Sequence, residues 1–526
     1  MKSLPLTIPD ANLPPLSIAK EMTMDWSKDA VRLGVVGTGA MGRGIAQVSA
    51  TGGMDVMMFD AAPGGAAKAR GAIVELLKSL VAKGRMSEAE VAAAEQRLKA
   101  VDNIADLAPC DVVIEAVFED LAVKRALFKE LEAALKPDAI IASNTSSIRI
   151  ASIAASCQQR GRIAGMHYFN PVPLMKLVEV IRSADTAPQT VEALTAIGKR
   201  QGRVPVTVGD TPGFLVNLGG TAIGTEGLRI YQEGVATPSQ IDAVMRDTCG
   251  FRMGPFELMD LTGIDVNFPA RRIIYEGFFH DRRMTPSPLH ESLFHAGRLG
   301  RKTKAGWYDY NDKGEKIDHG ADATSDVAPA MTIVVPEPIP TPLMVLLRDA
   351  EIVTKDDGKS PILLAPVGED CSSACIRAET DPKRTIAIDA LGDVAKRVTI
   401  MTAPAAKKSV RDSVVALLLA AGTKVTVIND SPGFIGQRIR CMIANLGCEM
   451  AQQRIASPAD IDTAMTLGLN YPQGPLAMAD TIGVRLVFTI LTRIQAITGD
   501  DRYRPSQWLR RRALLGLPAA TLDGAA

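Results

Sequence analysis

A histidine and a glutamate twelve residues apart are the strongest candidates for acid–base chemistry in this sequence. His167 stands in the segment GMHYFNP (165–171), and Glu179 lies in the apolar run LMKLVEVI (174–181). A carboxylate among apolar neighbours is costly to bury unless it is paired, and imidazole changes its charge near neutral pH. The two residues therefore predict a general base held by an orienting carboxylate. A structural histidine, satisfied by hydrogen bonds, is the other interpretation of His167 taken alone.

A glycine-rich loop adds a second kind of chemistry, the binding of phosphates. It follows the β-branched run VRLGVV (31–36) and opens a helical stretch. In a G-x-G-x-x-G loop the first glycine permits a tight turn, the second lets a pyrophosphate approach, and the third allows close helix–strand packing. The helix N-terminus attracts the phosphates. The predicted dinucleotide loop consists of Gly37, Thr38, Gly39, Ala40, Met41 and Gly42.

Asp60 indicates which dinucleotide binds. It ends the second apolar run (54–59), 23 residues after Gly37, where a carboxylate can accept hydrogen bonds from the adenosine ribose. The same charge would repel a 2′-phosphate, and the segment AAPGGAA (61–67) has no arginine to hold one. NAD is therefore expected, although Arg70 leaves NADP open.

The elements that must position these residues alternate between strands and helices. Strand-like runs occur at 31–36, 54–59, 112–116, 140–143, 175–181 and 204–208, and helical stretches at 41–49, 64–83, 88–99 and 124–135. This alternation is typical of parallel βαβ units with right-handed crossovers. The sequence therefore predicts an α/β Rossmann-type parallel sheet, followed by an all-helical domain from residue 210.

An internal repeat organises the rest of the chain. The motif Pro-Gly-Phe at 212–214 recurs at 432–434, 220 residues later, and the same offset aligns Asp260 with Asp480. A helical domain is therefore duplicated. The expected divisions are a flexible extension (1–30), an NAD-binding Rossmann domain (31–209), a first helical domain for substrate and dimerisation (210–311), a degenerate small α/β region (312–428) and a second helical domain (429–526).

The second half is not expected to hold another active site. Its first strand-like run (332–335) leads into prolines, which lack the N–H donors that phosphates need. The second helical copy has Gln437 where the first has Asn217, and no histidine follows His319.

Six longer segments of the chain resemble the L-3-hydroxyacyl-CoA dehydrogenase family, in its long bacterial form with a duplicated helical domain. They are VGTGAMGRGIAQ (36–47), EAVFEDLAVKRALF (115–128), SNTSS (143–147), GMHYFNPVPLMKLVEV (165–180), DTPGFLVN (210–217) and GRLGRKTKAGWYDY (297–310). The resemblance implies NAD-dependent oxidation of (S)-3-hydroxyacyl-CoA to 3-oxoacyl-CoA. Fatty-acid or aromatic-acid breakdown of the phenylacetate or adipyl-CoA type is the implied setting.

The resemblance also implies roles for residues of the reaction centre. His167 would take the proton of the 3-hydroxyl as hydride leaves C3, with Glu179 as its orienting partner. Ser146 would contact the reacting oxygen, and Asn217 would help to hold the substrate carbonyl. These four residues form the expected catalytic set.

Further positions match family residues that touch the cofactor or the substrate. Glu119, Lys124, Asn170 and Lys302 match cofactor contacts, and Lys83 is the candidate for contact with a CoA phosphate. One departure lies after Asn217. The family usually has an arginine and apolar residues there, whereas this chain reads LGGT (218–221).

Composition limits the partners and the compartment. Lysine plus arginine equals aspartate plus glutamate at 59 each, so no positive field favours nucleic acid or an anionic membrane. The N-terminal segment has no apolar run typical of a signal peptide or membrane helix. Seven scattered cysteines indicate neither a disulfide framework nor a metal site. We expect a reducing, cytoplasmic setting, an acyl-CoA partner and no metal.

Several alternatives stay open. The second helical copy is interpreted as a built-in dimer partner that packs on the first, and a further homo-oligomer is not excluded. The substrate could be a short-chain 3-hydroxybutyryl-CoA, or a sugar acid on the same scaffold. A cofactor-binding structural protein without catalysis is the non-enzyme alternative, against which the intact set of Ser146, His167, Glu179 and Asn217 argues.

Overall fold

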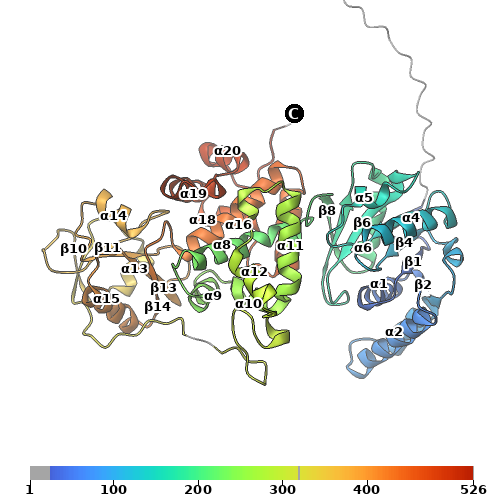
Figure 1. Cartoon of the computed structure of the whole chain (residues 1–526), viewed down its shortest axis with the longest axis horizontal. Coiled ribbons are helices and arrows are strands. Elements are labelled where there is room, and N and C mark those ends of the chain that lie inside the picture. The colour runs from blue at the N-terminus through green and yellow to red at the C-terminus, as the bar shows by residue number, and fades with distance from the viewer. Residues whose placement is uncertain (1–23, 318–319, 525–526) are drawn as a thin grey trace, which may run out of the picture.

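The computed structural model describes residues 24–317 and 320–524. Residues 1–23 of the predicted extension and His319 lie outside this part. Figure 1 shows three regions side by side, with an α/β unit of N-terminal residues at one end and a smaller α/β unit at the other. Helices from both copies of the repeat lie together between them. The two copies, which are far apart in the sequence, thus form one helical layer.

The N-terminal unit is built on an eight-stranded sheet in the order β3-β2-β1-β4-β5-β6-β7-β8. Its strands are β1 Arg32–Val36, β2 Asp55–Phe59, β3 Leu98–Ala100, β4 Val112–Glu115, β5 Ile140–Ser143, β6 Ile163–Tyr168, β7 Leu177–Arg182 and β8 Val204–Gly209. Its helices are α1 Ala40–Thr51, α2 Gly65–Ala82, α3 Glu88–Arg97, α4 Leu121–Ala134, α5 Ile150–Ala154 and α6 Pro188–Arg200. Neighbouring strands are parallel except β6 and β7, which run antiparallel. The expected Rossmann-type sheet is confirmed.

The sheet order explains where ligands can bind. Strands β2 and β3 lie on one side of β1, and β4 and the strands after it lie on the other, so the strand order reverses between β1 and β4. In open α/β sheets, ligands bind in the crevice at the carboxyl ends of the strands at such a point. The glycine loop follows β1, Asp60 follows β2, and Glu119 lies in the loop after β4. Strands β4 and β5 are buried along their whole length, as expected for strands with helices on both faces.

The helical layer contains the two copies of the repeat. The first has α7 Val216–Gly219, α8 Thr221–Gln232, α9 Pro238–Asp247, α10 Pro255–Thr262, α11 Ile264–Gly277 and α12 Pro288–His295. The second has α16 Ile435–Gln452, α17 Pro458–Leu469, α18 Pro475–Ile482, α19 Val484–Thr498 and α20 Gln507–Leu515. Helices α17, α18 and α19 each begin 220 residues after α9, α10 and α11. Each copy also uses one aspartate, Asp242 or Asp462, to accept two backbone N–H groups at the start of α10 or α18.

The two copies pack tightly against each other. Arg438 on α16 donates from Nε to Glu226 on α8 at 2.7 Å, and both side chains are almost completely buried. Burial raises the pKa of Glu226, but the charges of Arg438 and Arg502 outweigh it and hold that pKa below its ordinary value. Gly219 lies against Met465 of α17, where an added Cβ would overlap the Sδ atom. The LGGT departure therefore lies where the second copy approaches the first.

A smaller six-stranded sheet separates the two copies in the sequence. Its order is β10-β9-β11-β12-β13-β14, with β12 and β13 antiparallel. The strands are β9 Thr332–Val334, β10 Glu351–Val353, β11 Ile362–Leu364, β12 Thr385–Ile388, β13 Arg397–Thr402 and β14 Lys424–Asn429, and the helices are α13 Thr341–Leu346, α14 Cys371–Arg377 and α15 Lys408–Ala420.

Two short edge strands depart from the sequence prediction. The helix expected over 88–99 ends at Arg97, and β3 begins at Leu98, because residues 98–100 pair with the exposed side of β2. Strand β10 was not predicted either, and it pairs with β9 at the edge of the smaller sheet. Both strands have three residues, too few for a hydrophobic period to be recognised.

Within residues 24–317 and 320–524, no single helix is long and apolar enough to cross a membrane, and only α18 and α19 taken together, with a bend of 92° between them, pass by length and composition.

Candidate active site

His167 and Glu179 face each other across two neighbouring strands. They are directly paired in the antiparallel register of β6 and β7. Nδ1 of His167 lies 2.6 Å from Oε2 of Glu179, and both side chains are buried. An ionised carboxylate can only accept, so Nδ1 carries the proton and donates to it, which leaves Nε2 as the free acceptor. The pair therefore has the arrangement of a general base with its orienting group.

The second oxygen of Glu179 reaches the helical layer. Oε1 accepts the backbone N–H groups of Leu215 at 3.1 Å and Val216 at 2.8 Å, at the start of α7. Phe169 and Phe214 flank the imidazole, with ring centroids 4.6 Å and 5.9 Å from that of His167. The carboxylate is thus fully used by three hydrogen bonds, and the imidazole is held between two aromatic rings.

A cavity of about 660 Å³ opens beside this pair, between the carboxyl edge of the large sheet and the first helical copy. Ser146, His167 and Asn217 all line it. Nδ2 of Asn217 donates to the backbone oxygen of Ser146 at 3.5 Å, so the residue from the helical copy meets the loop after β5. Three of the four expected catalytic residues therefore line one cavity, and the fourth, Glu179, is buried behind His167.

The three glycines of the loop after β1 have the environments that a dinucleotide requires. Gly37 has φ +88°, and an added Cβ would lie 2.7 Å from the backbone oxygen of Ala116. A Cβ on Gly42 would overlap the backbone oxygen of Gly37, whereas one on Gly39 would have no neighbour within 4 Å. The first and third glycines therefore serve packing, and the second leaves an open approach for a phosphate. Met41, in the first turn of α1, lines the cavity.

Asp60 stands at the end of β2 beside this loop. It accepts from the backbone N–H and the hydroxyl of Thr38, both at 2.7 Å, and from the N–H of Ala62. Burial raises its pKa, but these hydrogen bonds outweigh it and hold the pKa of Asp60 below its ordinary value. Arg70 points elsewhere, because its guanidinium donates to the backbone oxygens of Leu98 and Glu95. An ionised Asp60 without an arginine beside it suits NAD.

Of the other expected cofactor contacts, Glu119 lines the cavity and Lys124 does not. Glu119 accepts from the hydroxyl of Thr145 at 2.6 Å and the N–H of Ser146 at 2.9 Å. Burial raises its pKa, but these bonds and the charge of Lys124 hold the pKa of Glu119 below its ordinary value. Lys124 itself is 1% exposed and pairs with Glu115 at 2.5 Å and Glu119 at 3.4 Å. It therefore lies behind Glu119, which lines the cavity.

Of the remaining predicted residues, one lines the cavity and two do not. Asn170 lines the cavity. Lys302 pairs with Asp265 at 2.5 Å, at the start of α11, and does not line the cavity. Lys83 caps the C-terminus of α2 and is exposed. Arg271 on α11 does line the cavity and was not singled out in the sequence, because an arginine in a helix gives no signal of burial.

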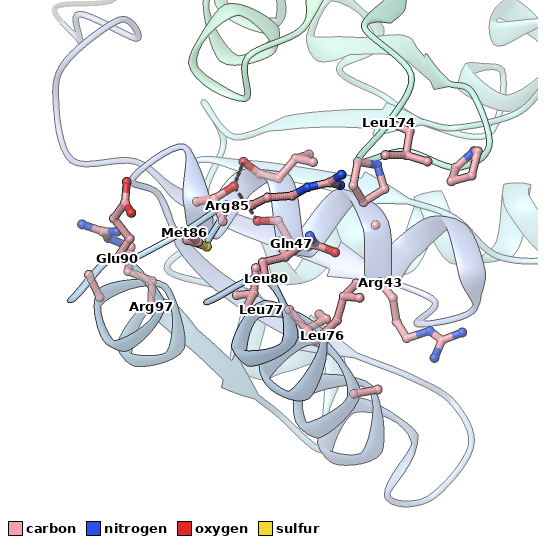
Figure 2. Close-up of a pocket in the computed structure, with 18 of the residues that line it drawn as sticks. Arg43, Gln47, Leu76, Leu77, Leu80, Arg85, Met86, Glu90, Arg97 and Leu174 are labelled. Atoms are coloured by element: carbon pink, nitrogen blue, oxygen red, sulfur yellow. Dashed lines mark hydrogen bonds between the residues drawn. The ribbon is translucent and has the colours of Figure 1, made fainter. Parts of the chain in front are cut away.

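A second cavity, of about 1020 Å³, lies between α1 and the hairpin of α2 and α3. Figure 2 shows Arg43 and Gln47 of α1 and Leu76, Leu77 and Leu80 of α2 around it. Sequence neighbours line the two cavities: Ala40 and Pro171 line this one, and Met41 and Asn170 line the first. Four arginines line the second cavity, namely Arg43, Arg85, Arg97 and Arg203.

Two further histidines lie on one helix. His290 is buried on α12, and His295 lies 3.8 Å from Glu291 on the exposed side of the same helix. Across residues 24–317 and 320–524, no group of three or more His, Cys, Asp or Glu side chains has the geometry to hold a metal ion.

Comparison with known proteins agrees with this arrangement. The family model described as 3-hydroxyacyl-CoA dehydrogenase, NAD binding domain, matches residues 32–211. The model for the C-terminal domain of the same family matches twice, at 213–310 and 433–524. The second match coincides with the repeat.

Individual relatives agree as well. The chain is 37% identical over 481 residues to a 3-hydroxyadipyl-CoA dehydrogenase of Escherichia coli (strain K12), covering 91% of this chain and 97% of that one. It is 39% identical over 281 residues to a 3-hydroxybutyryl-CoA dehydrogenase of Clostridioides difficile, covering 53% of this chain and 100% of that one. The crystal structure of a 3-hydroxybutyryl-CoA dehydrogenase from Escherichia coli K12 superposes with a TM-score of 0.83 at 36% identity, covering 93% of this chain and 99% of that one. The chain belongs to the 3-hydroxyacyl-CoA dehydrogenase family, and it is an NAD-dependent oxidoreductase.

Proposed function

We propose that this protein oxidises the 3-hydroxyl of an (S)-3-hydroxyacyl-CoA, with His167 as the general base. The observation that carries the proposal is the 2.6 Å contact between Nδ1 of His167 and Glu179. Because that contact fixes the proton on Nδ1, Nε2 is available to take the hydroxyl proton of the substrate. When bound along the glycine loop, NAD supplies the acceptor for the hydride that leaves C3.

The surrounding residues have distinct proposed roles. Glu179 stabilises the imidazolium that forms once Nε2 is protonated, since its carboxylate accepts the hydrogen bond from Nδ1–H. The hydroxyl of Ser146 contacts the reacting oxygen, and the amide of Asn217 holds the thioester carbonyl. Phe169 and Phe214 exclude water from the imidazole, which strengthens its interaction with the carboxylate. Together, His167 and Glu179 take the hydroxyl proton at Nε2, while Ser146 and Asn217 hold the substrate in place.

The second cavity supports a CoA thioester rather than a free hydroxy acid. Its floor carries apolar side chains of α2, and its lining includes the exposed arginines Arg43 and Arg85. A pantetheine arm suits the apolar floor, and phosphates suit the guanidinium groups. Since neighbouring residues of the glycine loop helix and of the segment after β6 line this cavity and the one with His167, we place the CoA moiety there. Arg43 and Arg85 are then better placed than Lys83 to meet its phosphates.

The second helical copy serves, in this proposal, as a built-in dimer partner of the first. The buried pair of Arg438 and Glu226 and the close approach of Met465 to Gly219 support this role. The seven cysteines are free thiols, which suits a reducing, cytoplasmic setting.

A substrate panel tests the proposed function. The full chain is assayed for NADH formation with 3-hydroxyacyl-CoA thioesters and with free hydroxy acids, in the presence of NAD or NADP. The thioesters should be oxidised with NAD. Oxidation of the free acids alone would favour a sugar-acid dehydrogenase, and no oxidation of either would favour a structural protein. Relatives named for 3-hydroxyadipyl-CoA and 3-hydroxybutyryl-CoA supply the first thioesters to try, in the setting of fatty-acid or aromatic-acid breakdown.

A further inference from the structure

Arg271 is a buried cation without a carboxylate partner. It lies on α11, is 8% exposed and lines the cavity that holds His167. Its Nη1 atom has no hydrogen-bond partner among the described residues. Burial lowers its pKa to about 10, with Tyr471 as the only opposing influence. Removing a charge from water is unfavourable unless an ion or hydrogen bonds compensate, so an anion beside the guanidinium would stabilise it.

A glycine on the facing helix makes room for this guanidinium. Gly224 lies inside α8, and an added Cβ would overlap the Nη2 atom of Arg271. Glycine weakens a helix interior relative to alanine. Its presence here allows Arg271 to lie against the backbone of α8 with its fork toward the cavity. The position of the Arg271 guanidinium therefore depends on glycine at position 224.

Two more polar side chains near Arg271 also lack partners. Both ring nitrogens of His290 and the hydroxyl of Tyr471 are buried without a hydrogen bond among the described residues. Burial, helped by the charge of Arg271, lowers the pKa of His290 to about 2, so its ring is neutral. Tyr471 belongs to the second helical copy, and lines a smaller cavity that shares Ile223, Leu258 and Leu469 with the first. Both groups can donate a hydrogen bond, and no acidic side chain among the described residues acts on Arg271 electrostatically.

Arg271 belongs to a different part of the protein from the expected cofactor contacts. The glycine loop, Asp60 and Glu119 belong to the sheet unit, whereas Arg271 contacts α8 and influences Tyr471, both in the helical layer. His167 and Arg271 line the same cavity, so a substrate with C3 at His167 could extend its acyl chain within that cavity toward the guanidinium.

We propose that Arg271 binds a carboxylate at the far end of the acyl chain, so that the preferred substrate is a 3-hydroxyacyl-CoA with a second, terminal carboxylate. This inference rests on the proposed function, because it takes the cavity to be the acyl site. A guanidinium presents two parallel N–H donors that match a carboxylate. The terminal anion supplies the partner that the chain itself does not provide, and a methyl end leaves Arg271 unpaired.

The test compares two thioesters that differ only at the far end. 3-Hydroxyadipyl-CoA and 3-hydroxyhexanoyl-CoA have the same six-carbon chain, ending in a carboxylate or a methyl group. With the full chain and NAD, we expect kcat/KM to favour the dicarboxylic thioester by about 10²-fold, since a site built for hydrogen bonds rejects an analogue that lacks them. Arg271→Met should reduce this ratio to about one or below, mainly through a higher KM for 3-hydroxyadipyl-CoA.

Matched variants keep the result interpretable. Arg272→Met removes the neighbouring arginine, which is exposed and pairs with Glu276, and should leave the ratio unchanged. Gly224→Ala retains Arg271 but displaces its guanidinium, and should lower the ratio as well. If Arg271→Met does not fold, as judged by thermal melting, the ratio of kcat/KM for the two thioesters in Gly224→Ala and Arg271→Lys tests the inference in its place. A wild-type ratio near one, or a ratio that survives Gly224→Ala and Arg271→Met, overturns the inference while leaving the dehydrogenase activity intact. Failure of both thioesters to reduce NAD overturns the proposed function instead.

Discussion

The carboxylate of Glu179 on β7 accepts the backbone N–H of Val216 at 2.8 Å, where the helical layer begins. Its other oxygen holds His167. The orientation of the base therefore depends on the contact between the sheet and the helices. Glu179 therefore orients His167 and also joins the large sheet to the first helix of the helical layer.

Replacing Glu179 by glutamine should separate orientation from packing. The amide has nearly the same shape, but its N–H can face Nδ1 and stabilise the wrong tautomer of His167. We expect kcat to fall by roughly 10³-fold with little change in KM, since the comparable change in a catalytic triad costs about 10⁴-fold. Steady-state NADH formation measures it, with the exposed Glu192→Gln as control. A loss confined to KM would assign Glu179 to substrate binding.

The preference for NAD should depend on Asp60. Asp60→Asn removes the charge that accepts from Thr38 and faces the ribose, so kcat/KM for NAD should fall roughly 10- to 100-fold, because a hydrogen bond to a charged group contributes about 1.5–3 kcal/mol. The ratio of kcat/KM for NAD to kcat/KM for NADP should fall at the same time. The wild-type preference should hold down to roughly pH 5, because the pKa of Asp60 lies below its ordinary value and the carboxylate stays ionised. Asp55→Asn, exposed at the start of β2, is the matched control, and an equal effect there would refute the assignment.

The buried pair between the helical copies should contribute strongly to stability. Glu226→Gln leaves Arg438 without its fully buried partner, so the free energy of unfolding should fall by about 3 kcal/mol. Glu276→Gln, in the exposed pair with Arg272, should change it by less than about 1 kcal/mol. Chemical denaturation of the full chain measures both.

The effect of Glu226 should also depend on pH. Its folded pKa is depressed, so its contribution is fully present above the unfolded pKa and is lost as pH falls through the folded value. The wild type and Glu226→Gln should therefore converge in stability at acidic pH. A constant difference between them below roughly pH 4 would contradict the low pKa of this group.

Truncation after residue 315 should expose the surface that the second copy covers. Glu226 would lose Arg438, and the apolar side of α8 would face water. We expect the shortened chain to dimerise or aggregate, as measured by light scattering. A well-behaved, active monomer would contradict the role of the second copy as a built-in partner.

Much of this account follows from the sequence for physical reasons. Alternating strands and helices specify a parallel sheet, and the 220-residue offset reappears in the starts of α9 and α17, α10 and α18, and α11 and α19. His167 and Glu179 could be paired in advance because a buried carboxylate needs a partner. The bonds from Leu215 and Val216 could not, because they require the path of the chain between β8 and α7.

Two buried charged residues could not be recognised as buried from the sequence. Lys124 lies on a helix, and its burial is compensated by Glu115 at the end of β4. Arg271 is buried because Gly224 and Tyr471, far away in the sequence, shape the space around it. In both cases burial of a charge is decided by contacts that composition and spacing do not encode.

The most direct measurement is NADH formation by His167→Ala with a 3-hydroxyacyl-CoA substrate, alongside titration of NADH binding to the same variant. Since Nε2 of His167 is the proposed proton acceptor, kcat should fall by roughly 10²- to 10⁴-fold, while the Kd for NADH stays close to that of the wild type. Unchanged NADH formation in this variant would contradict the account.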